Sequence, residues 1–185
     1  MPLKIDVPAG ELYGAIDPET GRKMFTKVEA TTLTLEHSLI SLAKWEAKWH
    51  KPYISSEKND EETIDYIRCM TTTQNVDPNV YKVLTRKNIE DITAYIQDPH
   101  TATKVPETHS NSMRHDVVTA ELIYYWMISY NIPVEFQKWH LNKLITLIRV
   151  FNYKNAPAKK MSSSELYSRN SALNRARRAK FNSKG

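Results

Sequence analysis

The chain has 185 residues, 41% hydrophobic and 10% aromatic, which is enough for one domain with a substantial core. Its single cysteine, Cys69, excludes an internal disulfide framework and fits a reducing compartment. The first residues, MPLKIDVPAG, lack the basic and apolar regions of a signal peptide, and no segment is long and apolar enough to suggest a membrane span.

The net charge of +5 is unevenly distributed along the chain. Residues 154–185 carry nine Lys/Arg against one acid, a net charge of +8. Residues 1–153 carry 17 basic and 20 acidic residues, a net charge of −3. This contrast predicts a mildly acidic body with a basic C-terminal tail. We therefore divide the chain into an N-terminal β-hairpin arm (1–34), a helical core domain (35–153) and the tail (154–185).

The first 34 residues predict β structure. A turn signal, Asp17-Pro18-Glu19-Thr20-Gly21, lies between two short segments, 11–16 and 23–28, and predicts a β-hairpin. Residues 31–35 are a candidate third strand. Because so few strands rarely stand alone, we expect them to pack on the helices or to extend the sheet of a partner.

The segment from Leu35 to His50 has the spacing of an amphipathic helix. Its large apolar residues recur every three or four positions and are Leu35, Leu39, Leu42, Trp45 and Trp49. Two interpretations stay open. This face packs on the core, or it presents Trp45 and Trp49 to a partner protein, since tryptophan is enriched at binding hot spots.

Two shorter helices are predicted over about 61–70 and 87–97, each behind a polar residue that can cap its first turn. Cys69 lies in the first of them, where we expect a small hydrophobic residue rather than a nucleophile. Residues 99–115 lack helix or strand periodicity and contain three histidines. They predict a long loop with solvated histidines.

The densest apolar stretch, Asp116 to Asn152, predicts two helices joined by a turn at 131–133. The first helix is apolar nearly all round, so we expect it to be buried on several sides. The second has one polar face, formed by Lys138, Asn142, Thr146 and Arg149. The short connection predicts an antiparallel pair, with Trp139 and His140 exposed at the turn end.

Beyond a linker, Ser162 and Glu165 have the spacing of a capping box and predict a last helix over about 163–181. Its apolar residues are few, so we expect it to be exposed or to order on binding. Its charge predicts salt-sensitive affinity for nucleic acid through residues 154–185, and docking on an acidic protein surface is the alternative. The candidate charged contacts are Lys159, Lys160, Arg169, Arg175, Arg177 and Arg178.

No residue pattern indicates catalysis. The six histidines show no HExxH spacing, and the chain has neither a CxxC pair nor a glycine-rich phosphate loop. We therefore expect no enzyme activity, no cofactor and no metal site. The predicted fold is mostly α: a compact helical domain around a central antiparallel helix pair, with a small N-terminal β-hairpin and a basic C-terminal helix or tail.

Three blocks of the sequence together resemble a protein family. They are LEHSLISLAKWEAKWHKPY (35–53), ETIDYIRCM with NVDPNVY (62–81), and IYYWMISYNIPVEFQKWHLNKLITLIRVFN with the tail KNAPAKKMSSSELYSRNSALNRARRAKFNSKG. As a set they are similar to the tail assembly chaperones of long-tailed, siphovirus-type bacteriophages. The resemblance covers about Thr32 to Gly185 and includes no catalytic residues.

This resemblance implies a non-enzymatic chaperone that binds the tape measure protein in the host cell cytoplasm during tail morphogenesis. Such a chaperone needs an exposed apolar or aromatic groove and a means to form homo-oligomers. The candidate groove-lining residues are Trp45, Trp49, Trp126 and Trp139. The alternatives are a structural virion component, such as a head-tail connector or tail protein, and a phage protein that binds nucleic acid through its basic tail.

Overall fold

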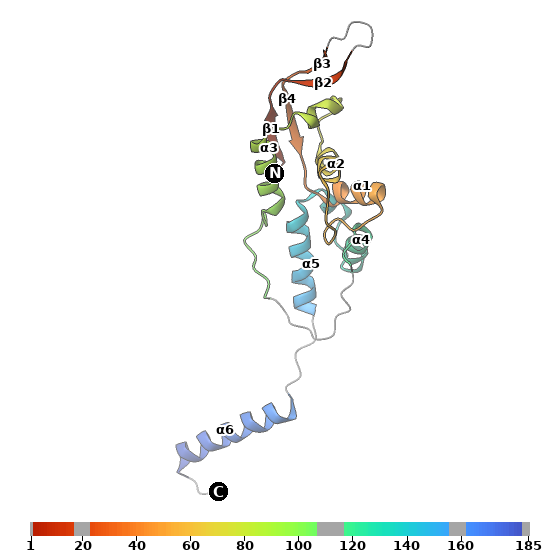
Figure 1. Ribbon diagram of the computed structural model, residues 1–185. Helices are drawn as coiled ribbons and strands as arrows, with labels where there is room; N and C mark the ends of the chain where they lie inside the picture. The colour runs from red at the N-terminus through yellow and green to blue at the C-terminus, as the bar shows by residue number, and fades with distance from the viewer. Residues whose placement is uncertain (1, 17–22, 107–116, 156–161, 183–185) are drawn as a thin grey trace. The chain divides into compact units, whose positions relative to one another are not determined.

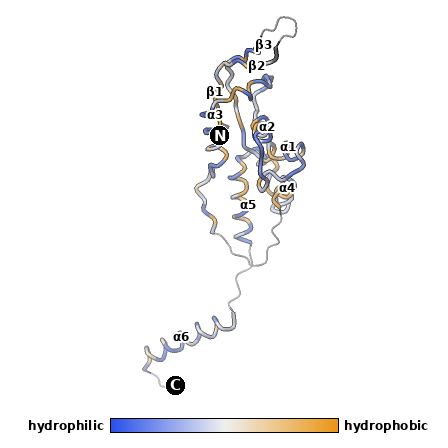
Figure 2. The backbone as a smooth tube through the Cα atoms, viewed as in Figure 1, coloured by the Kyte–Doolittle hydropathy of each residue, from blue (hydrophilic) through white to orange (hydrophobic). Residues whose placement is uncertain are grey.

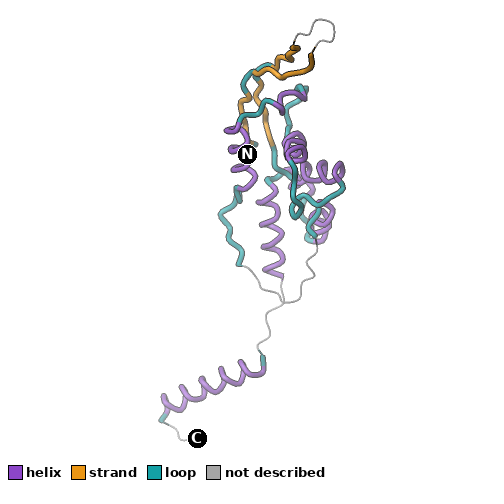
Figure 3. The backbone as a smooth tube through the Cα atoms, in the orientation of Figure 1, coloured by secondary structure: helices purple, strands orange, loops and turns teal. Residues whose placement is uncertain are grey.

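The structure of the chain is a computed structural model that describes residues 2–16, 23–106, 117–155 and 162–182 (Figure 1). The chain forms two compact units, Met1–Tyr153 and Lys154–Gly185. Within these described ranges, strands occur only in the first 35 residues and helices follow, so the mostly α class with a small β part is confirmed (Figure 3). None of the described helices combines the length and apolar character needed to cross a bilayer.

The N-terminal strands form two nested antiparallel pairs. The outer pair is β1 (Leu3–Val7) with β4 (Thr31–Leu35), and the inner pair is β2 (Gly10–Ile16) with β3 (Lys23–Val28). The inner pair confirms the predicted hairpin, whereas its turn (17–21) lies outside the described residues. Strand β1 was not predicted, because a five-residue segment carries too little pattern for recognition.

The outer pair is the part of the strands that is anchored to the helices. Ile5 opposes Leu33, and both side chains are buried with residues of the helices over 60–70 and 86–97. Backbone bonds extend this contact, since Thr72 N–H donates to the Thr34 carbonyl at 2.9 Å. The inner pair differs, because Phe25 and its neighbour Tyr13 are exposed. The outer strands thus pack on the helices of their own chain.

Helix α1 (Leu39–Trp49) begins later than the sequence pattern suggests. Leu35 belongs to β4, and Ser38 caps the helix through a reciprocal capping box with Ser41. Leu35 fits the period of both elements, so the spacing alone cannot assign it. The side-chain cap at Ser38 decides the boundary because it satisfies the free amides of the first turn.

Helices α2 (Asp60–Met70) and α3 (Arg86–Gln97) confirm the two shorter predicted helices, and a 3-10 turn, η1 (Pro78–Lys82), connects them. Together with the outer strands they enclose a first hydrophobic cluster, to which α1 contributes Trp45. Its buried residues are Ile5, Val7, Val28, Leu33, Leu35, Trp45, Tyr66, Ile67, Met70, Val80, Tyr81 and Ile92.

A second hydrophobic cluster joins α1 to α4 (Ala120–Ser129) and α5 (Leu141–Asn155). Its buried residues are Leu39, Leu42, Ala120, Ile123, Met127, Ile132, Leu141, Leu144 and Ile148. The second predicted helix of this region begins at Leu141 rather than soon after Pro133, because a 3-10 turn, η2 (Val134–Lys138), intervenes. As the first residue of α5, Leu141 has no acceptor for its N–H inside the helix. This N–H donates to the carbonyl of His37 at 2.8 Å instead.

The second unit contains α6 (Ser163–Phe181), capped by the predicted Ser162–Glu165 box. Every described residue of this helix is exposed, as its sequence predicted. Its backbone trace is largely hydrophilic, whereas α4 and α5 carry apolar segments (Figure 2).

Candidate functional site

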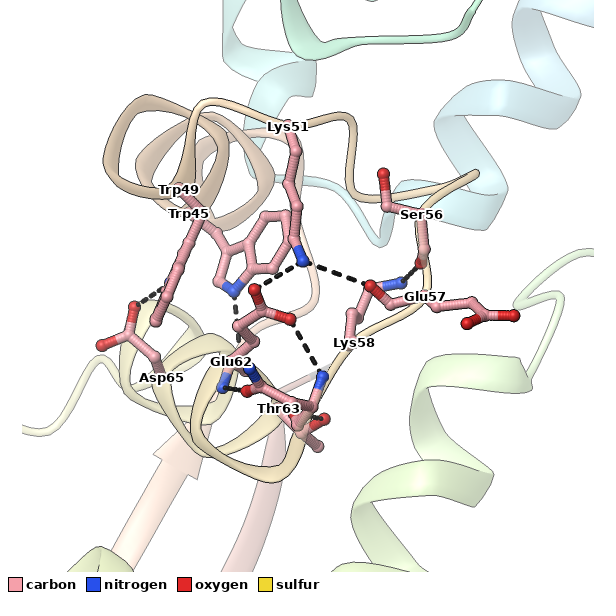
Figure 4. Close-up of polar contacts among 10 residues, drawn as sticks. Trp45, Trp49, Lys51, Ser56, Glu57, Lys58, Glu62, Thr63 and Asp65 are labelled. Carbon is pink, nitrogen blue, oxygen red and sulfur yellow. Dashed lines mark hydrogen bonds and ion pairs between the residues drawn. The ribbon is translucent and has the colours of Figure 1, made fainter.

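The first two candidate tryptophans lie between α1 and α2 (Figure 4). Trp45 is fully buried, and its indole N–H donates to the Glu62 carbonyl at 2.9 Å. Trp49 is half-buried, and its indole N–H donates to Asp65 Oδ2, also at 2.9 Å. The burial of Trp45 conflicts with its predicted place in a groove, because spacing shows which helix face is apolar but not what covers it.

Charged pairs close this α1–α2 contact at its edges, and Figure 4 shows the pair of Lys51 with Glu62. Lys48 Nζ lies 2.5 Å from Asp65 Oδ1, and Lys51 Nζ lies 2.5 Å from Glu62 Oε1. The hydrogen bond from Lys51, with that from the Asn59 backbone, lowers the pKa of the Glu62 carboxyl group. Both acids are therefore partners of neighbouring residues, and this region joins two helices instead of presenting an open site.

The third candidate, Trp126, is part of α4, a helix with two unlike faces. On the inner face of α4, Ile123 and Met127 are fully buried in the second cluster. On the outer face, Tyr125 is 63% exposed and Ile128 is 77% exposed. Trp126 is half-buried between these faces and packs on the second cluster. The prediction that this helix is buried on several sides is wrong, because α1 and α5 cover one side of it only.

A residue that the sequence did not single out fixes the start of α4. Glu46 of α1 is buried, and its carboxylate accepts the N–H groups of Ala120 and Tyr53, each at 2.7 Å. A buried carboxylate needs such donors to offset its desolvation. In the sequence Glu46 stands among exposed lysines of an amphipathic helix, so no signal distinguished it.

The fourth candidate, Trp139, follows η2 and is half-buried. Its ring stacks on Phe136 with 3.8 Å between the ring centroids, and Lys143 Nζ lies 4.1 Å from its centroid. Trp139 also lines a cavity of about 210 Å³ together with Pro2, Glu36, His37, Tyr95, His100, Lys138, His140 and Lys143. Of the four candidate tryptophans, Trp139 thus lines this cavity.

Three histidines from separate parts of the chain meet at this cavity. His140 stacks on His100 with 4.0 Å between their centroids, and His37 lies 5.0 Å from His140. Both His37 and His140 are buried, so the prediction of an exposed His140 is wrong. Its Nε2 atom donates to the Tyr95 carbonyl at 3.0 Å, which ties the turn before α5 to the end of α3.

His37 and His140 remain neutral at physiological pH. Burial, with the nearby His140 and His100, lowers the pKa of His37 to about 3. Burial is also the main reason that the pKa of His140 is lowered to about 4. The His37 Nδ1 atom lies 2.6 Å from the Tyr66 hydroxyl group, which gives it a partner inside the fold. Sequence reasoning missed this cluster because its members are far apart in the chain. The other two histidines of the predicted loop, His109 and His115, lie outside the described residues.

Two further predicted faces can be compared with the structure. Asn142, assigned to the polar face of α5, donates from Nδ2 to the carbonyl groups of Ile96 and Asp98, at 2.8 and 2.9 Å. The polar side chain of Asn142 thus joins α5 to the C-terminal end of α3. In α6 the candidate contacts Arg169, Arg175, Arg177 and Arg178 are all exposed, whereas Lys159 and Lys160 lie outside the described residues.

Among the described residues, no group of three or more His, Cys, Asp or Glu side chains is arranged to hold a metal ion. Comparison with protein-family models, with curated proteins and with solved structures finds no match for this chain. Function must therefore be inferred from the surfaces themselves. Two stand out: the outer face of α4 and the basic helix α6.

Proposed function

We propose that this chain is a non-enzymatic tail assembly chaperone of a long-tailed bacteriophage, which binds the tape measure protein in the host cytoplasm. The sequence blocks quoted above support the family. The observation that carries the binding role is the outer face of α4, defined by Tyr125 and Ile128. These two large apolar side chains are each more than half exposed, whereas the inner face of the same helix is fully buried.

The chemistry of this face suits an apolar helical client. Tyr125 and Ile128 are three residues apart, so they lie on neighbouring positions of one helix side. Aromatic residues are enriched at the centres of protein interfaces, and exposed apolar groups gain free energy when a partner covers them. Val117 and Val134, at either end of α4, are also more than half exposed. In this proposal Trp126 and Trp139 border the client, while Trp45 supports the surface from inside.

The second hydrophobic cluster would make this surface rigid. In the proposal α4 and α5 act as the central helix pair, and both bury residues in that cluster with α1. The Glu46 carboxylate fixes the first turn of α4, and Tyr124 donates to Gln137 of η2 at 2.9 Å. A preformed surface loses less conformational entropy on binding, which favours affinity for the client.

The test is affinity capture of the tagged full-length chain from infected cells, followed by mass spectrometry. The wild-type chain should recover the tape measure protein. The double variant Tyr125→Ser/Ile128→Ser should recover about tenfold less, which corresponds to roughly 1.4 kcal/mol of binding free energy. The matched control is Leu166→Ser/Tyr167→Ser, which removes an exposed apolar pair from α6 and should recover the wild-type amount.

Purified virions provide the second readout. A chaperone should be absent from finished particles. Many copies of the chain in virions would contradict the proposal and favour a structural tail or connector component. Equal loss of the client in both double variants would also contradict it, because the effect would not belong to α4.

A further inference from the structure

The second unit contains a helix that is capped at both ends by its own residues. At the start of α6 the Glu165 N–H donates to Ser162 Oγ at 3.1 Å, and Glu165 Oε2 accepts the Ser162 N–H at 2.8 Å. At the other end Asn182 adopts a left-handed conformation with φ 49°, and its N–H donates to the Arg178 carbonyl. These caps satisfy terminal amides and carbonyls locally, so α6 does not need a covering core to complete its ends.

The composition of α6 indicates how a partner would recognise it. The helix carries five Lys/Arg and one acid, Glu165. Its large apolar residues, among them Leu166, Leu173 and Phe181, are spread along 16 residues and are all exposed. A partner therefore gains little from apolar burial and must recognise charge and hydrogen-bonding groups.

One side of α6 concentrates hydrogen-bonding side chains. Five residues fall within about 100° of the helix circumference, at 100° per residue. They are Tyr167, Asn170, Ser171, Asn174 and Arg178. We call this set the amide stripe. Arg175 and Arg177 fall on opposite borders of it, roughly 70–90° from its centre.

We infer that α6 binds duplex DNA by lying in the major groove, with the amide stripe facing the base edges. Arg175 and Arg177 would then reach phosphates on the two sides of the groove. Asparagine amides and arginine guanidinium groups are the side chains that form paired hydrogen bonds with adenine and guanine there. An α-helix fits the major groove of B-form DNA in width.

The same residues argue against two other partners. An acidic protein helix presents carboxylates, which only accept hydrogen bonds, whereas Asn170 and Asn174 both donate and accept as base edges do. Duplex RNA has a deep, narrow major groove that side chains cannot read. This activity is separate from client binding by α4, and the two can fail independently.

The experiment is fluorescence anisotropy of the full-length chain with labelled duplex DNA, duplex RNA and single-stranded DNA of one sequence, between about 50 and 200 mM salt. The DNA duplex should bind at least about tenfold more tightly than either other probe. Arg175→Gln/Arg177→Gln should weaken binding and reduce the slope of log K against log salt by about 1.8. The control Lys82→Gln/Lys87→Gln makes the same charge change on the first unit and should bind like the wild type.

A selection of bound duplexes from a random pool tests the amide stripe directly. The wild type should enrich a sequence motif. Asn170→Ala/Asn174→Ala should lose that motif with an unchanged salt slope, since alanine preserves the helix and no charge is removed. Three results would overturn the proposal. The chain would bind the three probes with equal affinity, or polyglutamate would displace the labelled duplex as well as unlabelled DNA does, or the lysine control would weaken binding as much as the arginine variant.

Discussion

Helices α1 and α6 begin and end by similar local chemistry, yet they have opposite surroundings. Both start at a serine in a reciprocal capping box, Ser38 and Ser162, and both end at a residue in the left-handed conformation, His50 and Asn182. Helix α1 nevertheless buries Trp45 in the first hydrophobic cluster and other side chains in the second, whereas every described residue of α6 is exposed.

The difference separates two contributions to helix stability. Caps determine where a helix begins and ends, and they contribute about 1 kcal/mol each. Packing of an apolar face contributes several times more and depends on residues far away in the chain. Helix α1 is stabilised both by its caps and by packing of an apolar face, whereas α6 is stabilised by its caps. Three experiments test this contrast.

The largest expected effect comes from removing the side chain that α1 buries most deeply. Trp45→Ala should lower the free energy of unfolding by about 3–5 kcal/mol, because the indole is fully buried and hydrogen-bonded to Glu62. Leu173→Ala in α6 should change it by less than about 0.5 kcal/mol. Urea unfolding monitored by circular dichroism measures both, and a small loss for Trp45→Ala would contradict the two-cluster description.

The next effect depends on pH and belongs to the first unit. His37 has a pKa lowered from 6.5 to about 3, so between these values the unfolded chain binds a proton that the folded chain excludes. Stability is therefore complete above about pH 6.5 and falls as the pH decreases, by an amount on the order of 2–4 kcal/mol. Urea unfolding at a series of pH values measures this loss.

Variants assign that pH dependence to a residue. His37→Gln should roughly halve the fall in unfolding free energy between pH 6.5 and 4.5, because one buried imidazole is gone while His140, whose pKa is also lowered, remains. His50→Asn removes an exposed histidine from the end of α1, keeps a residue that tolerates the left-handed conformation, and should leave the slope unchanged. An unchanged slope for His37→Gln would place the proton uptake elsewhere.

The smallest effect compares the two serine caps. Ser38→Ala should lower the unfolding free energy of the first unit by about 1–2 kcal/mol, since Ser38 is buried and bonded to Ser41. Ser162→Ala should leave that value unchanged and reduce the helicity of α6 alone, by an amount that NMR chemical shifts of residues 163–181 would measure. Equal effects of both substitutions on the first unit would contradict the separation of the two helices.

Local chemistry made several elements predictable from the sequence. The β2–β3 hairpin, the helices over 60–70, 86–97 and 163–181, and the Ser162 cap all follow from turn residues, caps and periodicity within a few positions. The exposure of α6 also follows, because a sequence with so few apolar residues cannot bury a face.

Tertiary structure decided the features that depend on what lies across from each segment. Trp45 is an interior residue because α2 covers it, and Ile128 is a surface residue because the elements around α4 cover only its inner face. Glu46 became a cap for a helix 74 positions away, and His37, His100 and His140 became one cluster. A linear pattern records the period of a segment, whereas burial is set by its neighbours in space.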